Sequence, residues 1–410
     1  MPRTRQRVWL LRLLTFITSV LMVCVAFLLI EGILFARDFL GARGTTGTTF
    51  EGSVYEFCAS RHHRLLPNGR FRHTSYEYDY IWANNSLGMR DRERPRQKPP
   101  DAFRILILGD SMIQGQGVTL EDAMVTRLEG LLNHPARTKP IEVLNGGVFG
   151  YSPMLEYLYL QEIVDPLQPD LVVVGFFLQN DVGEDNFYAR KARSSPNGEA
   201  ISFDDREWPW SSILEMLDRG PELQTLDMVG EFRGGHWWEG VKDVLRHSQV
   251  LRLVKSHVDG LAYPARRERE FALVREHQDD IRYDLGLVNY PVRTREERLG
   301  YWAFSAKYLE TMSALCRARG VPMVLLVIPP AERLDGTTEF DEPYEVLHEL
   351  GRRLSVPVVN LLPDFVGKDP YSLYYKFDRH WTPEGNRLAA EVVARELRRV
   401  GVLPGEDRPE

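Results

Sequence analysis

Residues 104–111 read Arg-Ile-Leu-Ile-Leu-Gly-Asp-Ser, an apolar run that stops abruptly at a glycine, an aspartate and a serine. Such a run is typical of a buried parallel strand, and the polar residues that end it predict a sharp turn into a helix. The turn places Ser111 at the carboxyl end of the strand, where open α/β sheets bind their ligands and where free helix amides can hold an anion. Ser111 is therefore a candidate nucleophile, although a serine in a turn or a helix cap has the same local signature.

A candidate base lies near the other end of the chain. Residues 377–385 read Phe-Asp-Arg-His-Trp-Thr-Pro-Glu-Gly, so Asp378 precedes His380 by two residues. Thr382 is a suitable N-cap and Pro383 a suitable first helical residue, which predicts a helix directly after the histidine. A serine nucleophile needs a base and a group that orients the base. His380 and Asp378 have the chemistry for these two roles.

Donors for an oxyanion follow two further apolar runs. After residues 141–144 comes a glycine-rich bend, residues 145–150, whose backbone amides can approach a substrate closely. After residues 170–177 comes Asn180, whose side-chain amide can serve the same oxygen. Taken singly, the bend is an ordinary turn and the asparagine an ordinary cap. Because they follow successive strands of one inferred sheet, we expect their ends to converge.

The rest of the chain alternates apolar runs with helical periodicity, which is the pattern of an α/β doubly wound sheet. Right-handed crossovers then place helices on both faces. Five parallel strands in flavodoxin-like order are the simplest topology that fits. The expected strands are residues 105–108, 141–144, 171–177, 323–328 and 356–361.

These residues resemble the SGNH hydrolases, also called GDSL esterases and lipases. The four sequence blocks of that family correspond to residues 109–111, 145–150, 180–181 and 378–380. The resemblance implies that the oxyanion donors are the Ser111 amide, the Gly150 amide and the Asn180 side chain, with Gly147 as a substitute for Gly150. It extends to Asn-Asn-Ser-Leu-Gly-Met-Arg at residues 84–90, which looks like a segment that precedes the catalytic domain in membrane-tethered members.

Two positions depart from the family pattern. Leu178 stands where the third block usually has a glycine, whereas Asn180 is intact. Phe377 stands where the family commonly has its aspartate, and Asp378 lies one residue closer to His380. The shorter spacing occurs in relatives that act on cell-envelope polysaccharides. Asp378 is therefore expected to orient His380, with a backbone carbonyl as the alternative.

The N-terminal stretch predicts a membrane anchor. Residues 13–30 contain no charged side chain and, with their apolar flanks, can cross a bilayer as a helix of about 20 residues. Arginines on the leading side predict that the start stays in the cytoplasm and that everything after about Arg37 is exported, to the periplasm or beyond. No Ala-x-Ala-like site follows the run directly, so a retained anchor is expected rather than a cleaved signal peptide. The leading arginines are Arg3, Arg5, Arg7 and Arg12.

Composition argues against several other classes. The chain has 410 residues, a net charge of −7 and no basic stripe beyond its N-terminus, so nucleic acid is not an expected partner. Cys24, Cys58 and Cys316 have neither metal-ligand spacing nor the pattern of a disulfide framework. No glycine-rich phosphate loop is present, so neither a nucleotide nor any other cofactor is expected.

These features divide the chain into six parts. Residues 1–36 are the leader and anchor, 37–100 an exported segment with a linker, 101–182 and 301–401 the two parts of the core, 183–300 an insertion and 402–410 a tail. The insertion contains four tryptophans and an amphipathic run. We expect it to be helical and packed on the core, with a lid or a sugar-binding platform as the alternative.

Resemblance and expected location together predict a serine esterase that hydrolyses or transfers acyl groups. The expected substrate is an O-acetylated envelope or exported polysaccharide, and the acceptor is water or a sugar hydroxyl. A lipase or thioesterase that acts near the membrane is one alternative. A non-catalytic carbohydrate-binding or export scaffold is another, but it would have no use for Ser111, Asn180 and His380 together. The sequence does not indicate any protein partner.

Overall fold

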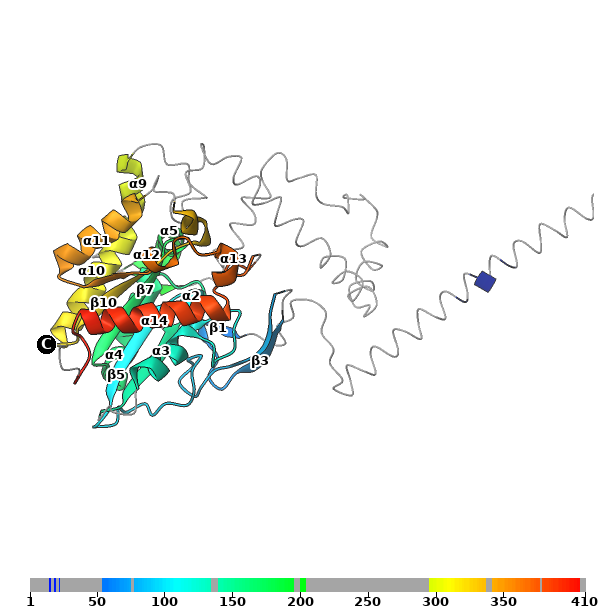
Figure 1. Ribbon diagram of the computed structural model, residues 1–410, viewed down its shortest axis with the longest axis horizontal. Coiled ribbons are helices and arrows are strands. Elements are labelled where there is room, and N and C mark those ends of the chain that lie inside the picture. The colour runs from blue at the N-terminus through cyan, green and yellow to red at the C-terminus, as the bar shows by residue number, and fades with distance from the viewer. Residues whose placement is uncertain are drawn as a thin grey trace, which may run out of the picture. The chain divides into compact units, whose positions relative to one another are not determined.

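A sheet of five parallel strands lies at the centre of the computed structural model (Figure 1). The order across the sheet is β11-β10-β7-β5-β6, and each neighbouring pair runs parallel. Numbered along the chain within this sheet, the order is 2-1-3-4-5, which confirms the predicted flavodoxin-like topology. The strands are β5 (Phe103–Gly109), β6 (Ile141–Gly147), β7 (Leu171–Phe177), β10 (Met323–Ile328) and β11 (Val358–Asn360).

The structure describes residues 54–74, 77–133, 139–194, 200–203, 295–336, 341–376 and 378–405, together with Thr15, Thr18, Ser19 and Met22. The chain divides into two units, residues 1–49 with 225–269 and residues 50–224 with 270–410. The four described residues of the first unit are helical. The remainder of the predicted anchor at 13–30 lies outside the described residues. Among the described residues, no helix has the length and apolar character needed to cross a membrane.

Helices cover both faces of the sheet. On one face, α3 (Met124–Leu132) packs against α14 (Pro383–Arg399), and on the other α4 (Pro153–Leu167) packs against α10 (Ala303–Ala318). The remaining helices are α2 (Ser111–Gln114), α5 (Asp181–Lys191), α9 (Arg295–Tyr301), α11 (Glu342–Leu354), α12 (Leu362–Phe365), α13 (Pro370–Leu373) and the 3₁₀ helix η3 (Ala331–Asp335).

Alternate side chains of the central strand enter two separate cores. Ile105 and Ile107 of β5 pack in the core under α3 and α14. Leu106 and Leu108 point the other way, into the core under α4 and α10. All four are fully buried. A strand with both faces covered in this way reads as a continuous apolar run, which explains why the sequence predicted it.

The predicted strand at residues 356–361 is shorter in the structure. Its described strand β11 covers only Val358–Asn360. Pro357 has no amide hydrogen to donate to the neighbouring strand, although its carbonyl accepts from the Leu325 amide at 2.9 Å. The Val356 amide instead closes the end of α11 by donating to the Gly351 carbonyl at 2.8 Å.

Within the described ranges, three two-stranded antiparallel sheets lie outside the central sheet, and the sequence did not predict them. Two precede the core: β1 (Tyr55–Cys58) with β2 (His62–Leu65), and β3 (Arg70–Thr74) with β4 (Asp79–Ala83). The third, β8 (Ala192–Ser194) with β9 (Ala200–Phe203), lies in the stretch expected to be a helical insertion. Most of that insertion, including its tryptophans, lies outside the described residues.

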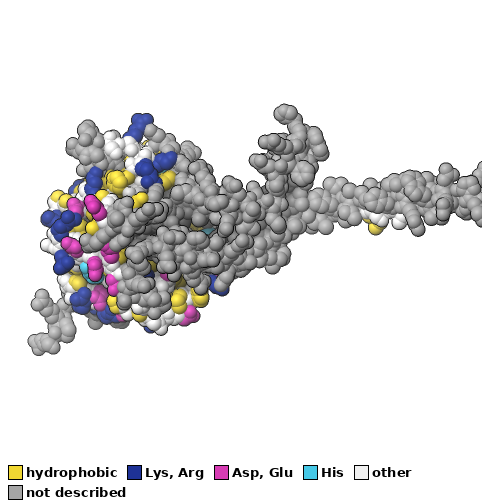
Figure 2. All heavy atoms as spheres, turned by 90° about the horizontal axis from the view of Figure 1, so that it is seen from above, with side chains coloured by type: hydrophobic (Ala, Val, Ile, Leu, Met, Phe, Trp, Pro, Cys, Tyr) yellow, Lys and Arg dark blue, Asp and Glu magenta, His cyan; other side chains and the backbone are white. Residues whose placement is uncertain are grey.

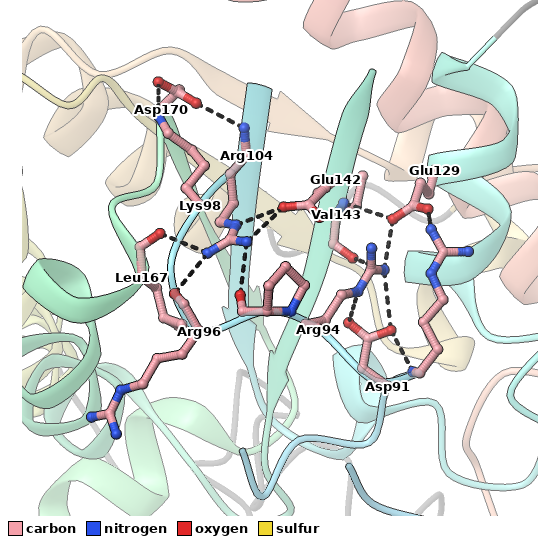
Figure 3. A network of polar contacts seen from close by, with 12 residues as sticks. Asp91, Arg94, Arg96, Lys98, Arg104, Glu129, Glu142, Val143, Leu167 and Asp170 are labelled. Atoms are coloured by element: carbon pink, nitrogen blue, oxygen red, sulfur yellow. Dashed lines mark hydrogen bonds and ion pairs between the residues drawn. The ribbon is translucent and has the colours of Figure 1, made fainter. Parts of the chain in front are cut away.

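Ion pairs tie the segment before β5 to the edge of the sheet (Figure 3). Arg94 contacts both Asp91 and Glu129, and it also donates to the Val143 carbonyl of β6 at 3.0 Å. Arg104 of β5 contacts Glu142 on β6, and it donates to the carbonyls of Pro95 and Arg96. Arg94 and Arg104 are buried, so each guanidinium depends on these partners to offset its lost hydration. Residues 91–96 are thus held against the sheet at several points.

The described surface carries both signs of charge. On the face seen in Figure 2, Lys and Arg side chains are interspersed with Asp and Glu side chains. Many of them pair along helices, as Arg387 does with Glu384 and Glu391 on α14. Exposed pairs of this kind contribute little to stability.

Candidate active site

Ser111 begins helix α2 directly after the central strand, as predicted. β5 ends at Gly109, and Asp110 is the N-cap of α2, where its side chain accepts from the Met112 amide at 2.9 Å. Asp110 thereby satisfies one of the amides that a helix start leaves unpaired. Ser111 is the first residue of the helix and only 4% exposed. In the described chain, its own amide has no hydrogen-bond acceptor.

Three glycines from three neighbouring strands make room for α2. A Cβ atom added to Gly109 of β5 would lie 2.2 Å from Ile113 Cγ1, and one added to Gly175 of β7 would lie 2.7 Å from the same atom. A Cβ atom on Gly147 of β6 would lie 2.3 Å from the Gln114 amide nitrogen. These distances are shorter than van der Waals contact, so the helix sits against the bare backbone of the strands. The glycines therefore set how closely Ser111 approaches the sheet.

Arg90 holds the other end of α2. This buried guanidinium donates to the carbonyls of Gln114, Gly115 and Val118, and it lies 4.5 Å from the ring centre of Trp82. A cation suits the carbonyls at a helix C-terminus because they carry the negative end of the helix dipole. Residues 84–90, singled out in the sequence, thus support the segment that carries Ser111.

His380 and Asp378 meet Ser111 in one chain of hydrogen bonds. His380 Nε2 lies 2.7 Å from Ser111 Oγ, and His380 Nδ1 lies 2.5 Å from Asp378 Oδ1. The predicted cap is confirmed: the Thr382 hydroxyl accepts from the Gly385 amide and Pro383 begins α14. The structure therefore brings together the three side chains that the sequence selected for nucleophile, base and orienting group.

A tight turn allows the aspartate to lie only two residues before the histidine. Arg379, between them, has a left-handed backbone with φ of 71°. The Tyr375 amide donates to the His380 carbonyl at 2.8 Å, and the Arg379 amide donates to the Tyr375 carbonyl at 3.1 Å. Arg379 also pairs with Glu332 of η3. Phe377, which stands at the family's usual aspartate position, lies outside the described residues.

The charges of this pair stabilise each other. Burial raises the pKa of Asp378, but the His380 charge and hydrogen bonds from His380 and Tyr78 outweigh burial and bring the pKa to about 2. Burial lowers the pKa of His380, but the Asp378 carboxylate outweighs this effect and the pKa is raised above its usual value. Asp378 is therefore ionised at neutral pH and can stabilise a protonated His380.

Asn180 lies beside the residue that precedes Ser111. It is the N-cap of α5, and its Nδ2 donates to Asp110 Oδ2 at 3.3 Å. The same side chain also forms a hydrogen bond to Glu184, which opposes the rise in the Glu184 pKa caused by burial. Leu178, at the position of the family's glycine, is buried, and its amide donates to the Ile328 carbonyl at 3.2 Å. The backbone before Asn180 is thus held by the neighbouring strand β10.

Gly150 follows β6 in a left-handed conformation with φ of 69°. The loop that carries it begins beside β5, because the Val148 amide donates to the Gly109 carbonyl at 2.9 Å. The next amide, that of Phe149, donates to Gln114 Oε1 on α2 at 3.1 Å. Gly147 is not available as a substitute donor, since its amide donates to Asn145 Oδ1 at 3.0 Å.

Buried carboxyl groups lie behind this loop, and the sequence analysis did not identify them. Glu156 of α4 and Asp181, Glu184 and Asp185 of α5 are all at most 3% exposed. Desolvation by burial raises all four pKa values, that of Asp185 to about 6. In the described part of the chain, Glu156 has no hydrogen-bond partner for its carboxyl oxygens. In sequence, three of the four looked like ordinary acidic residues in the first turns of a helix.

The described residues hold no group of His, Cys, Asp and Glu side chains arranged to bind a metal ion. Cys58 and Cys316 are both free thiols.

A serine, a histidine and an aspartate joined by hydrogen bonds at the carboxyl end of an α/β sheet define a class of candidate hydrolases. Residues 294–409 match the family described as "SGNH hydrolase-like domain, acetyltransferase AlgX". This match agrees with the resemblance to the SGNH hydrolases over the C-terminal part of the chain. The match includes Asp378 and His380 but begins after Ser111.

No curated protein matches the sequence. Several solved structures are similar to it. The acetyl xylan esterase AlAXEase is 13% identical with a TM-score of 0.37, over 72% of this chain and 100% of its own. The acetylxylan esterase Axe2 from Geobacillus stearothermophilus is 13% identical with a TM-score of 0.37, over 73% and 94%. The psychrotrophic esterase EstA from Pseudoalteromonas sp. is 10% identical with a TM-score of 0.37, over 72% and 97%.

Proposed function

We propose that this protein is a serine esterase or acyltransferase in which Ser111 is the nucleophile. The observation that carries the proposal is the hydrogen-bonded chain from Ser111 Oγ through His380 to Asp378. A non-catalytic scaffold has no need for a serine hydroxyl joined to a base of raised pKa. The family match to an acetyltransferase domain supports acyl chemistry at this site.

In the proposed reaction, His380 Nε2 takes the Ser111 proton as Oγ bonds to the ester carbonyl carbon. The Ser111 and Gly150 amides and Asn180 Nδ2 stabilise the oxyanion of the tetrahedral intermediate. The intermediate collapses to an acyl-serine, and His380 returns its proton to the departing alcohol. His380 then takes the proton of an acceptor hydroxyl as its oxygen bonds to the acyl carbon. The bond from the acyl carbon to Ser111 Oγ breaks, and His380 returns the proton to Oγ.

The acceptor decides whether the enzyme hydrolyses or transfers. Water gives a free acid, whereas a sugar hydroxyl gives a new ester. The family description names an acetyltransferase, so we propose that the acyl group is acetyl and that a polysaccharide is its donor or acceptor. The predicted N-terminal anchor supports a site outside the cytoplasm, where envelope and exported polysaccharides are found. A lipase or thioesterase is the alternative for the same triad.

The proposal is tested with the full-length chain purified in detergent. We expect a serine-directed fluorophosphonate to label the wild type, and we expect Ser111→Ala to abolish both labelling and turnover of 4-nitrophenyl acetate. His380→Ala should lower the turnover about as much as Ser111→Ala does, because the two side chains act as a unit. Ser86→Ala removes an exposed hydroxyl that bonds to Glu93 and serves as the control. Full turnover by Ser111→Ala would exclude a serine mechanism.

Product analysis then separates hydrolysis from transfer. Acetylated and unacetylated glycan oligosaccharides are added together with the acyl donor, and the products are weighed by mass spectrometry. A mass increase of the unacetylated oligosaccharide indicates transfer, and release of acetate alone indicates hydrolysis. Activity on long-chain acyl esters only would favour the lipase or thioesterase.

A further inference from the structure

The connection between β3 and β4 reaches the acid residue of the active site. The Tyr78 hydroxyl donates to Asp378 Oδ2 at 2.6 Å, and the Asp378 amide donates to Glu77 Oε2 at 2.7 Å. These contacts span about 300 residues of sequence. Tyr78 and Glu77 lie outside the residues that match the family. A segment that precedes the core thus holds both the side chain and the backbone of Asp378.

Tyr78 is itself fixed by aromatic packing. Its ring centre lies 5.0 Å from that of His73, 5.7 Å from that of Tyr80 and 5.2 Å from that of Tyr375. The side chain is 9% exposed. Burial and the neighbouring Asp378 carboxylate raise the pKa of Tyr78, so its hydroxyl stays protonated and donates. A buried phenol with a charged acceptor forms one of the stronger kinds of hydrogen bond.

Both carboxylate oxygens of Asp378 are in use as a result. Oδ1 lies against His380, and Oδ2 accepts from Tyr78 and, at 3.5 Å, from Gln116. A carboxylate bound on one side only can rotate about its Cβ–Cγ bond, since that torsion is broad. A donor on Oδ2 opposes this rotation and keeps Oδ1 directed at the imidazole. Such a donor matters more here because Asp378 lies on a tight turn, where no helix or strand holds its backbone.

The same N-terminal segment also braces the glycine-rich loop. His63 Nε2 lies 2.7 Å from the Phe149 carbonyl, and burial lowers the pKa of His63 to about 3, so the ring is neutral and donates through Nε2. The Tyr55 hydroxyl donates to Gln114 Oε1, which also accepts from the Phe149 amide. Residues 54–83 therefore contact the candidate site on both its acid side and its oxyanion side.

We propose that Tyr78 is a positioning residue of the active site, whose hydroxyl holds the Asp378 carboxylate in the orientation that directs His380 at Ser111, while Glu77 anchors the backbone of the same residue. The proposal rests on the proposed function, since it assigns a part in that reaction. Tyr78 touches neither the acyl group nor the reacting atoms. It acts through Asp378.

The test compares Tyr78→Phe with Tyr80→Phe in the full-length chain. Tyr80 lies on β4, and its hydroxyl bonds to His73 and to the Gly117 amide without contacting Asp378. Tyr78→Phe should lower kcat on 4-nitrophenyl acetate roughly 10- to 100-fold with KM unchanged, the loss expected for one hydrogen bond to a charged group. Tyr80→Phe should keep its kcat while losing stability. Wild-type kcat in Tyr78→Phe, or an equal loss in both variants, would overturn the proposal.

Two further variants probe the same contacts. In an Asp378→Asn background, Tyr78→Phe should cause little additional loss, because the two residues act through one another. Full additivity would show that Tyr78 acts elsewhere. Glu77→Ala should lower kcat and Glu77→Gln should restore it, since glutamine keeps an oxygen that accepts from the Asp378 amide. Failure of glutamine to restore kcat would remove the backbone anchor from the proposal.

A spectroscopic measurement separates this proposal from the proposed function. In a chain with isotope-labelled histidine, the Nδ1 proton of His380 should resonate far downfield because of its short bond to Asp378, and Tyr78→Phe should move it upfield. An unmoved resonance would overturn the positioning role even where no esterase activity is found. Conversely, the wild type could show no turnover that depends on Ser111 while the resonance still responds to Tyr78→Phe. That result would refute the proposed reaction but not the contact between Tyr78 and Asp378.

Discussion

Asn180 has a structural contact in this site, and we propose that its side chain also serves the chemistry. It caps α5 with its backbone, and its Nδ2 bonds to Asp110 beside the nucleophile. The bond to Asp110 is 3.3 Å long and uses one of the two hydrogens of the amide. An amide placed in this way before the substrate arrives needs no reorganisation when the oxyanion forms.

We therefore expect Asn180→Ala to lower kcat roughly 10²- to 10³-fold with little change in KM, because the amide meets the oxyanion only in the transition state. Steady-state kinetics on 4-nitrophenyl acetate measures the effect. Asn186→Ala, on the same helix, is the matched control: its side chain bonds to the Val182 and Tyr301 carbonyls, so it should lose stability and keep kcat. An unchanged kcat in Asn180→Ala would reduce Asn180 to a helix cap.

At the scale of residues, the sequence predicted the groups that stand at ends of strands and starts of helices. Ser111, His380 and Asp378 were identified because turn and cap signals place them, and the structure brings them together. Tyr78 could not be identified in this way. Its partner is 300 residues distant, and a single tyrosine between two short strands has no periodicity or motif that indicates a contact.

At the scale of elements, helices α4 and α5 bury several carboxyl groups. Glu156 has no hydrogen-bond partner within the described chain, and burial raises its pKa well above the usual 4.5. The folded protein therefore favours the protonated form. The unfolded chain loses this proton as the pH rises through about 4.5, whereas the folded chain still holds it. The contribution of Glu156 to the free energy of unfolding then falls with rising pH, by about 1.4 kcal/mol per pH unit.

Glu156→Gln replaces the titrating carboxyl group with a neutral amide of the same shape, so it removes the loss of stability that Glu156 causes at higher pH. We expect the variant to be more stable than the wild type at pH 8 and about equally stable at pH 4, with a shallower decline between them. Urea unfolding across that range measures it. Glu349→Gln on α11 replaces an exposed glutamate and should follow the wild-type curve. The same difference in stability between Glu156→Gln and the wild type at pH 4 and pH 8 would contradict a protonated Glu156.

The same scale shows why some elements were predictable. Strands β7 and β10 are covered on both faces and apolar throughout, and β5 is apolar apart from Arg104, so their sequence signal is strong. The hairpin strands are three to five residues long and mix charged with aromatic side chains, as in Asp79–Ala83. Pairing with the facing strand stabilises such segments, and their own sequence carries little of that information.

At the scale of the whole molecule, the N-terminal run decides where the chemistry takes place. The proposal of a retained anchor rests on the basic leader and on the uncharged residues 13–30. We expect the full-length protein to remain in the membrane fraction through a carbonate wash. A protease added outside the inner membrane should digest the chain after Arg37, because the proposed anchor would place the rest of the chain outside the cytoplasm.

Mass spectrometry of the mature protein is the companion measurement. A mature N-terminus near residues 41–44 would mean that the leader is cleaved and the enzyme is released. Protection from external protease would place the catalytic part in the cytoplasm, and the case for an envelope polysaccharide as substrate would then fail. The division of the remaining chain into core and insertion also stays a prediction, since most of residues 183–300 lies outside the described structure.

The distance in sequence between the nucleophile and its base has a consequence for timing. Ser111 precedes His380 by 269 residues. At about 5–20 residues per second, the ribosome adds the histidine roughly 13–54 s after the serine. Throughout that interval the growing chain carries a nucleophile without a base, and neither Tyr78 nor Gln116 has an aspartate to hold. In the proposed reaction, ester chemistry can begin only after His380 has been added, and a product terminated before His380 would be inert toward acyl donors.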